Sequence, residues 1–489
     1  MSVESGFHFQ NGLRWIVHSD NALLSTTIRI QIPVGFSFES LNKNLKGLTH
    51  LTEHMMFHST LYYSNYFKNV DCIFYSFGET FKGETSDEWT TYFVTLNLDS
   101  VTQIKTILDL MINQLFYSCL NDEDLLKEKR IVAIEYSEHN SDPFEILYGQ
   151  YVRPTVFTKN WNFLSWDGHQ PQKLLNLPYF STDMIRALLD IFYQPEFITC
   201  TIVTHFPINE TKNILLDVWS RIKNEPHYNS NNIWYPIFLN YRVKWFDSKL
   251  VAIAKFPSIL SNDPINLYQP WLNHQIKFVI KHSPHTRQDS IYLSLAILIP
   301  FMYQDLYYWI NCIDILSDIL AGAPLSSIPY LLRESYGCIY KVRANLEFFT
   351  NASLLSFFTV FSSSSQPLLF DLLADVFKLL EQPISDSDIL LHVEHAQRED
   401  SLKILTSDDI TQDYAEFSKM NWSQNQKQIS LDQIKCTPNL VRLLASLLLQ
   451  PQNISVCYLA PLNPVASLQP PSDYPNYLRG FNILPNYDS

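Results

Sequence analysis

Two histidines and a glutamate near the start of the chain have the types and the spacing of a metal site. They lie in the segment GLTHLTEHMMF, which contains His50, Glu53 and His54. On a helix, His50 and His54 are four residues apart and project from the same face, one turn above the other. Two imidazoles placed in this way can bind one zinc ion, and their order is the inverted form of the HExxH signature. Glu53 is the candidate general base, because a carboxylate beside the metal can take a proton from a zinc-bound water.

The alternative for this segment is a surface helix with two solvated histidines. From the composition of the chain, such a pentapeptide is expected by chance roughly 0.02 times. Gly47 stands where a helix would begin, and Met55, Met56 and Phe57 supply an apolar side. These neighbours favour a helix that packs on a core and presents both histidines to one site.

A third ligand must come from another part of the chain. The segment LLKEKRIVAIEYSEHNSD offers Glu128, Glu135, Glu138 and His139. Glu128 and Glu135 are seven residues apart, which places them two turns apart on one helix face. We predict that Glu135 is the third metal ligand and that Glu128 orients one of the histidines. The alternative is a pair of exposed glutamates.

Composition narrows the class of protein. The chain has 489 residues, enough for two or more domains; 46% are hydrophobic and 17% are charged. The formal net charge of −14 is spread along the chain, which argues against nucleic acid as a partner. Seven cysteines without a CxxC pair read as reduced thiols. With no visible secretory signal and no apolar run of transmembrane length, we expect a cytoplasmic protein without a membrane partner.

The chain contains a weak internal repeat. The strand-like segment 11–20 is echoed by residues 274–284, and the segment 194–203 is echoed by residues 450–459. Chance explains either pair alone, but two pairs in the same order favour a duplication. Each unit would have roughly two hundred residues, the size of one domain.

Within each unit the periodicity predicts strands, then paired helices, then a closing strand. The predicted strands include 24–34, 89–98, 290–300 and 354–361, and the predicted helices are 45–58, 101–117, 124–139, 303–320, 367–380 and 386–403. This order predicts an α+β fold with two homologous domains, each a mostly antiparallel sheet with helices packed on one face. The predicted parts are a zinc-binding domain 1–206, a linker 207–270, a second homologous domain 271–460 and a Pro-rich tail 461–489.

Together these motifs resemble the pitrilysin/insulinase family of zinc peptidases with an inverted motif, in the half-length form similar to mitochondrial processing peptidases. The family pattern runs from an Asn-Gly-Leu strand through a Val-Gly…Glu turn to the zinc helix. The chain has Asn11-Gly-Leu, Val34-Gly with Glu39, and the segment 47–57 at these places. In the family a helix with two glutamates seven residues apart follows, the second of which binds zinc. The long interval before Glu135 implies a small insertion near 62–74.

The resemblance also assigns residues that touch the substrate. An edge strand of the family pairs with the substrate backbone, and here it comprises Lys82, Gly83, Glu84 and Thr85, with Lys82 in place of the usual Asn. In the second unit, a segment similar to Arg-Glu-x-x-Gly-x-x-Tyr places Arg333 and Tyr340 on the two functional positions. There they would stabilise charge on the substrate carbonyl near the scissile bond. The alternative is an ordinary helix-to-strand turn at Gly337.

The residues and the resemblance together predict a zinc-dependent endopeptidase that hydrolyses peptides or unfolded segments, with Zn2+ as cofactor. The family builds its chamber from two halves, with the Arg/Tyr segment opposite the zinc. One chain that holds both implies a homodimer, and a heterodimer with a related chain is the alternative.

Two other functions compete with this prediction. One is a non-catalytic structural or binding subunit of the same fold, although such subunits typically lose the zinc residues. The other is an unrelated zinc hydrolase that acts on substrates other than peptides. General peptide turnover and dedicated leader removal are both open from the sequence.

Overall fold

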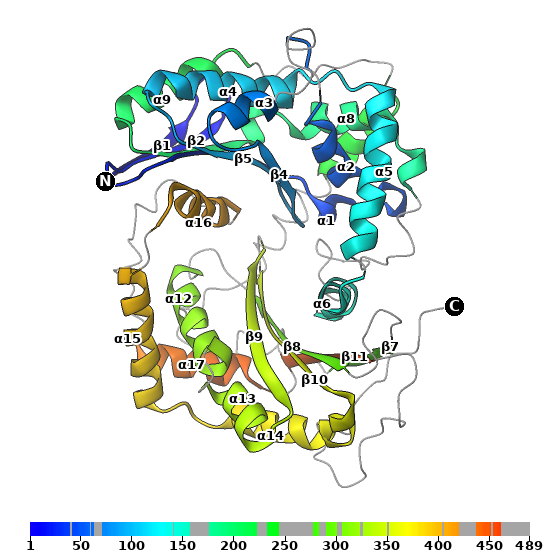
Figure 1. Cartoon of the computed structure of the whole chain (residues 1–489), viewed down its shortest axis with the longest axis vertical. Helices are drawn as coiled ribbons and strands as arrows, with labels where there is room; N and C mark the ends of the chain where they lie inside the picture. Colours follow the sequence, from blue (N-terminus) through cyan, green and yellow to red (C-terminus); the bar gives the residue numbers. More distant parts are fainter. Residues whose placement is uncertain are drawn as a thin grey trace. The chain divides into compact units, whose positions relative to one another are not determined.

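The computed structural model describes most of the chain, in two compact units (Figure 1). The described residues are 1–39, 42–58, 60–62, 71–139, 141–156, 176–222, 232–243, 277–282, 290–300, 306–322, 326–349, 352–402, 405–419, 437–450 and 453–460. Residues 223–231 and 244–270 of the predicted linker, the predicted tail 461–489 and most of the predicted insertion 62–74 lie outside them. The predicted domain boundaries stay a prediction.

The first unit is built on a sheet of six strands in the order β1-β2-β6-β3-β5-β4. Only the pair β2 and β6 is parallel, and the other neighbours are antiparallel. The strands are β1 (Ser2–Phe7), β2 (Arg14–Ser19), β3 (Thr26–Ile32), β4 (Lys82–Thr85), β5 (Thr90–Leu96) and β6 (Thr199–Thr204). β4 is therefore an edge strand, as the resemblance implied.

The second unit repeats this order with five strands, β7-β11-β8-β10-β9. The strands are β7 (Lys277–His282), β8 (Ser290–Pro300), β9 (Ile339–Phe348), β10 (Ala352–Ser362) and β11 (Ile454–Ala460). The two parallel neighbours, β7 and β11, carry the sequence echoes of β2 and β6. The same strand order in both units confirms the predicted duplication and the α+β fold.

Helices follow equivalent strands in the two units. In the first unit α4 (Val101–Phe116) and α5 (Asp122–His139) follow β5, and in the second α14 (Leu369–Glu381) and α15 (Asp386–Leu402) follow β10. The larger remaining helices are α2 (Leu48–Met55), α3 (Asp71–Ser76), α8 (Thr182–Phe192), α9 (Ile208–Trp219), α12 (Leu306–Ser317), α16 (Ser407–Lys419) and α17 (Pro438–Leu448). Short helical segments are α1 (Phe36–Glu39), α6 (Pro143–Glu145), α7 (Arg153–Val156) and α13 (Ser327–Pro329), with π-helical turns at η2 (Ile146–Val152), η6 (Asp318–Gly322) and η7 (Tyr330–Ser335).

The units are not continuous in sequence, because α16 belongs to the first unit and packs on β3 and β6. Figure 1 shows it on the face of the sheet opposite α4 and α9. The β3 sequence TTIRIQI alternates polar and apolar residues, a pattern typical of a half-exposed strand, yet all seven residues are buried. Arg29 donates to Asp408 at 2.9 Å, and Gln31 Nε2 donates to the Ala415 carbonyl at 3.3 Å. Helix α16 thus supplies partners for the polar face of β3.

A reciprocal arrangement exists in the second unit, where the π-helix η2 packs on β8 and β11. Its Ile146 and Leu147 share a core cluster with Tyr292 and Ala296 of β8. Side chains of a strand alternate between faces, so Leu293 and the neighbouring odd-numbered residues point to the opposite side. Each sheet is therefore covered on one face by a segment from the other half of the sequence. That segment is α16 for the first sheet and η2 for the second.

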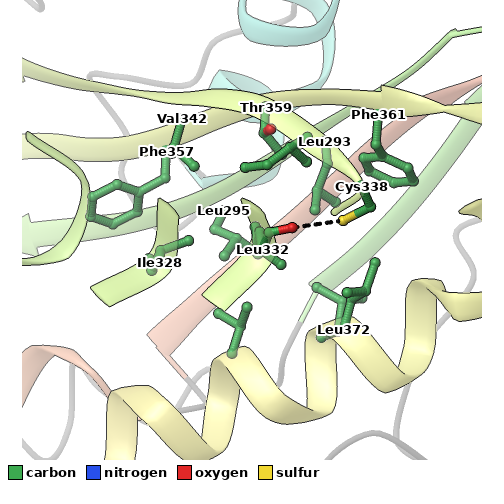
Figure 2. A pocket seen from close by; sticks show the side chains of 13 residues that line it. Leu293, Leu295, Ile328, Leu332, Cys338, Val342, Phe357, Thr359, Phe361 and Leu372 are labelled. Atoms are coloured by element: carbon green, nitrogen blue, oxygen red, sulfur yellow. Dashed lines mark hydrogen bonds between the residues drawn. The ribbon is translucent and has the colours of Figure 1, made fainter. Parts of the chain in front are cut away.

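An apolar pocket lies on that opposite side, between the sheet and the helices α13 and α14 (Figure 2). Leu293, Ile328, Leu332 and Leu372 are among its lining side chains, and the Cys338 thiol donates to the Leu332 carbonyl at 3.2 Å. Among the described residues that line it, none is charged. The pocket therefore offers no charged group, and Cys338 is the only residue of a metal-ligating type among the described residues that line it.

One helical stretch of the second unit, Cys312–Ser335, is long and apolar enough to cross a membrane by length and composition alone. The expectation that no apolar run reaches that length is wrong by this measure. Of its 18 most apolar consecutive residues, 67% are buried inside the protein. Core helices of water-soluble proteins can have the same length and composition. The stretch is weak evidence for a membrane, and the cytoplasmic location stays a prediction.

Candidate metal centre

The helix that carries the histidines, α2, is fixed at its first turn by a buried carboxylate. Glu39 accepts hydrogen bonds from the main-chain N–H groups of Gly47 and Thr49, both at 2.7 Å, and from the Thr49 hydroxyl. The first N–H groups of a helix have no partners within it, so Glu39 satisfies donors that would otherwise be buried and unpaired. Gly47 has φ 90°, a conformation that favours glycine. Glu39 and Gly47, which both match the family pattern, thus determine where α2 begins.

The three predicted metal ligands converge at one point. His50 and His54 bring their Nε2 atoms to 3.2 Å, and Glu135 Oε2 lies 3.2 Å from His54 Nε2 and 3.8 Å from His50 Nε2. With Zn–N bonds of about 2.0–2.1 Å, tetrahedral ligand atoms lie about 3.3 Å apart. Among the groups of His, Cys, Asp and Glu in the described residues, only this one could hold a metal ion by the closeness of its ligand atoms. The residues present therefore fit zinc.

Glu128 contacts one of these histidines through the ring nitrogen that does not face the other ligands. Its Oε2 lies 3.0 Å from His54 Nδ1, and its side chain is 8% exposed. Burial alone would raise the pKa of Glu128, but hydrogen bonds from His54 and His58 outweigh it and lower the pKa to about 2. A carboxylate that accepts the Nδ1 proton fixes the tautomer that leaves Nε2 free for a metal. The predicted supporting contact of Glu128 is present.

Glu53 lies against the edge strand β4 and is 6% exposed. The Thr85 hydroxyl donates to its Oε2 at 2.6 Å, while a Cβ on Gly83 would come within 2.6 Å of its Oε1. Burial raises the pKa of Glu53 to about 7, against the opposing effects of the Thr85 hydrogen bond and the charge of His54. A carboxyl whose pKa lies near neutral pH is suited to accept and return a proton. Thr85 and the missing side chain at Gly83 hold it in place.

The raised pKa of Glu53 predicts a pH-dependent stability of the metal-free protein. Because the pKa rises from 4.5 to about 7 on folding, the folded state binds the proton more tightly, and stability falls as pH rises between these values. For this group the loss amounts to roughly 3 kcal/mol. We expect Glu53→Gln to remove that part of the pH dependence.

Urea unfolding of chelator-treated protein at pH 5 and pH 8 measures it. Glu39, whose pKa burial also raises to about 7, is present in both proteins, so its contribution cancels in the difference between them. Equal losses of stability in wild type and variant would contradict the prediction.

The predicted substrate strand is only partly free for a substrate. Lys82 pairs with Glu79 at 2.6 Å, and both side chains are about half exposed. Glu84 is exposed, whereas Gly83 and Thr85 face Glu53. As the edge of the sheet, β4 can still add a peptide strand through its main chain. Its role in substrate binding stays a prediction.

Arg333 and Tyr340 lie in the second unit, on η7 and at the start of β9. The Arg333 side chain is 44% exposed, with Nε 3.6 Å from the carboxylate of its neighbour Glu334. The side chain of Tyr340 lies outside the described residues. Gly337 has φ 62°, so the helix-to-strand turn is present as well. The catalytic role of this segment stays a prediction.

Several residues that support the centre are not predicted from the sequence in that role. The sequence predicts Glu39 only as part of a family turn, and no pattern in it indicates the Thr85–Glu53 hydrogen bond. His58, four residues after His54 on the same segment, contacts Glu128 at 2.9 Å and faces Asp124 at 3.4 Å. The repeated four-residue spacing of His50, His54 and His58 was the available signal for His58.

Known proteins provide an independent comparison for this site. The profile of the insulinase family (Peptidase family M16) matches residues 15–160, which contain α2, β4 and α5. The chain is 22% identical over 205 residues to the uncharacterized zinc protease YmxG from Bacillus subtilis (strain 168). That match covers 42% of this chain and 47% of the relative, so it spans about half the relative's length.

Solved structures show the same fold over nearly the whole chain. A peptidase M16 inactive domain from Pseudomonas fluorescens is similar with a TM-score of 0.70 and 13% identity, covering 96% of this chain and 100% of that one. The periplasmic protease PqqL from Escherichia coli is similar with a TM-score of 0.68 and 16% identity, covering 96% of this chain but 49% of that one. Fold, profile and the converging side chains agree. The chain therefore carries a Peptidase M16 (insulinase/pitrilysin) family domain and is a homologue of a zinc protease.

Proposed function

We propose that this protein is a zinc-dependent endopeptidase that hydrolyses peptides or unfolded polypeptide segments. The observation that carries the proposal is the convergence of His50, His54 and Glu135 within 4.8 Å. Glu53, whose carboxylate is buried, lies on the same helix as the two histidines. Bound by these three side chains, zinc supplies a Lewis acid that polarises a carbonyl and makes water a stronger nucleophile.

The side chains of the protein then provide the proton transfers. Glu53, held by Thr85, accepts the proton of the attacking water as the C–O bond forms. It returns that proton to the amide nitrogen as the C–N bond breaks, so the amine leaves neutral. An extended peptide that adds to the outer edge of β4 would pass close to Glu53, because Gly83 and Thr85 of this strand contact it.

The test is a comparison of metal-loaded and metal-free protein. We expect purified protein to contain about one zinc per chain and to cleave members of a random peptide library. Treatment with a chelator is expected to abolish cleavage, and added Zn2+ to restore it. Zinc-loaded protein that cuts no peptide in the library would favour the second hypothesis, a non-catalytic subunit of the same fold. That hypothesis has its own support, because one similar structure is described as an inactive domain.

We further propose that two copies of this chain form the working enzyme. PqqL has about twice the length of the present chain, which matches 49% of it. Two copies would supply the equivalent amount of fold, each with a zinc centre in its first unit and Arg333 in its second. A heterodimer with a related chain is the alternative.

A further inference from the structure

A third histidine, His58, contacts the carboxylate that lies against the candidate ligand His54. His58 lies just beyond the end of α2, and its Nε2 is 2.9 Å from Oε1 of Glu128. The other oxygen of the same carboxylate, Oε2, is 3.0 Å from Nδ1 of His54. The Glu128 carboxylate thus lies between two imidazoles, one of which is a candidate metal ligand.

Both ring nitrogens and the main-chain carbonyl of His58 have partners. Its Nδ1 is 3.4 Å from Oδ1 of Asp124, which lies one turn before Glu128 on α5. Its main-chain carbonyl accepts from the buried side chain of Gln114 at 2.9 Å, and Gln114 also donates to the Met56 carbonyl. The side chain of His58 is 15% exposed. These contacts leave the ring little freedom, so it can serve as a fixed donor.

We infer that His58 is a positioning residue of the metal centre, which acts through Glu128 to orient His54. A carboxylate with one bonded oxygen can swing about its end, whereas one with both oxygens bonded keeps its orientation. If His58 is removed, Glu128 loses a hydrogen bond in a nearly buried site, and the ring of His54 is held less firmly. This inference rests on the proposed function only in that the centre must bind zinc.

Two polar replacements separate the two contacts of His58. The amide nitrogen of Gln occupies nearly the place of Nε2, so His58→Gln can still donate to Glu128. The amide nitrogen of Asn occupies the place of Nδ1, so His58→Asn keeps the Asp124 side and loses the Glu128 contact. Both variants are polar and of similar size, which makes each a control for the folding of the other.

The measurement is zinc affinity, by competition with a chromophoric chelator. We expect His58→Asn to weaken zinc binding about 10- to 100-fold and His58→Gln to remain close to wild type. The absorption bands of the Co2+-substituted protein are expected to change in His58→Asn and not in His58→Gln, because they report the geometry of the ligands.

A double-mutant cycle with Glu128→Gln tests whether His58 acts through that residue. We expect His58→Asn to cost little more affinity once Glu128 is replaced, because the two changes share one pathway. Additive losses, or equal affinities of His58→Asn and wild type, would overturn the inference. Wild-type protein that binds no zinc would instead refute the metal centre, and the inference with it.

Discussion

Glu53→Gln is expected to lower the turnover of peptide hydrolysis by about 100- to 10,000-fold, the range typical for loss of a general base. The substitution keeps the shape of the side chain and an oxygen that can accept from Thr85. What it removes is the ability to take and return a proton. Because Glu53 is not one of the three converging ligands, zinc content is expected to stay at the wild-type level.

The measurements are kcat on a peptide found in the library screen and zinc per chain. Glu138→Gln is the matched control, since Glu138 is an exposed carboxylate on α5, one turn beyond Glu135. A Glu53→Gln protein that retained zinc and cleaved at the wild-type rate would contradict the proposed mechanism. Loss of zinc would instead show that Glu53 has a structural role in the centre.

Mixing two inactive variants is expected to restore activity if two chains share each active site. Arg333→Ala removes a donor proposed to stabilise charge on the substrate carbonyl, which typically costs about 100- to 1,000-fold in kcat. In a mixed dimer, the Arg333→Ala chain offers an intact Glu53 and the Glu53→Gln chain offers an intact Arg333. One of its two sites is then complete.

With equal amounts and free exchange of subunits, half of the dimers are expected to contain one chain of each variant. Each of these has one complete site of two, so recovery is expected to reach roughly a quarter of wild-type activity. Activity is measured before and after a cycle of dilution and reconcentration that allows exchange. If chains exchange, as shown by a tagged subunit, and no activity returns, each chain completes its own site or pairs with a different protein.

The sequence predicted those parts of the site that depend on local spacing. His50 and His54 are one helical turn apart, and Glu128 and Glu135 two turns apart, so a helix places each pair on one face. The duplication followed from the two sequence echoes, which fall on the parallel neighbours β2 with β6 and β7 with β11, whereas the strand order is known only from the structure.

Contacts between distant segments were beyond such reasoning. The bond between His58 and Glu128 joins residues 70 positions apart, and the spacing of the histidines indicates His58 but not this partner. The alternating sequence of β3 could not show that a helix from the second half would bury its polar side. Arg29 and Gln31 take partners on α16 almost 400 residues later, and only the folded chain brings them together.

The placement of α16 has a consequence for synthesis of the protein on the ribosome. About 200 residues separate β6 from α16, which at roughly 5–20 residues per second takes about 10–40 s to translate. During that time the six-stranded sheet could form, but Arg29 and Gln31 would lack the partners that bury them. The sheet of the first unit would remain open along one face until nearly the whole chain had emerged. The cover of that face is thus made last, although the strands beneath it are made first.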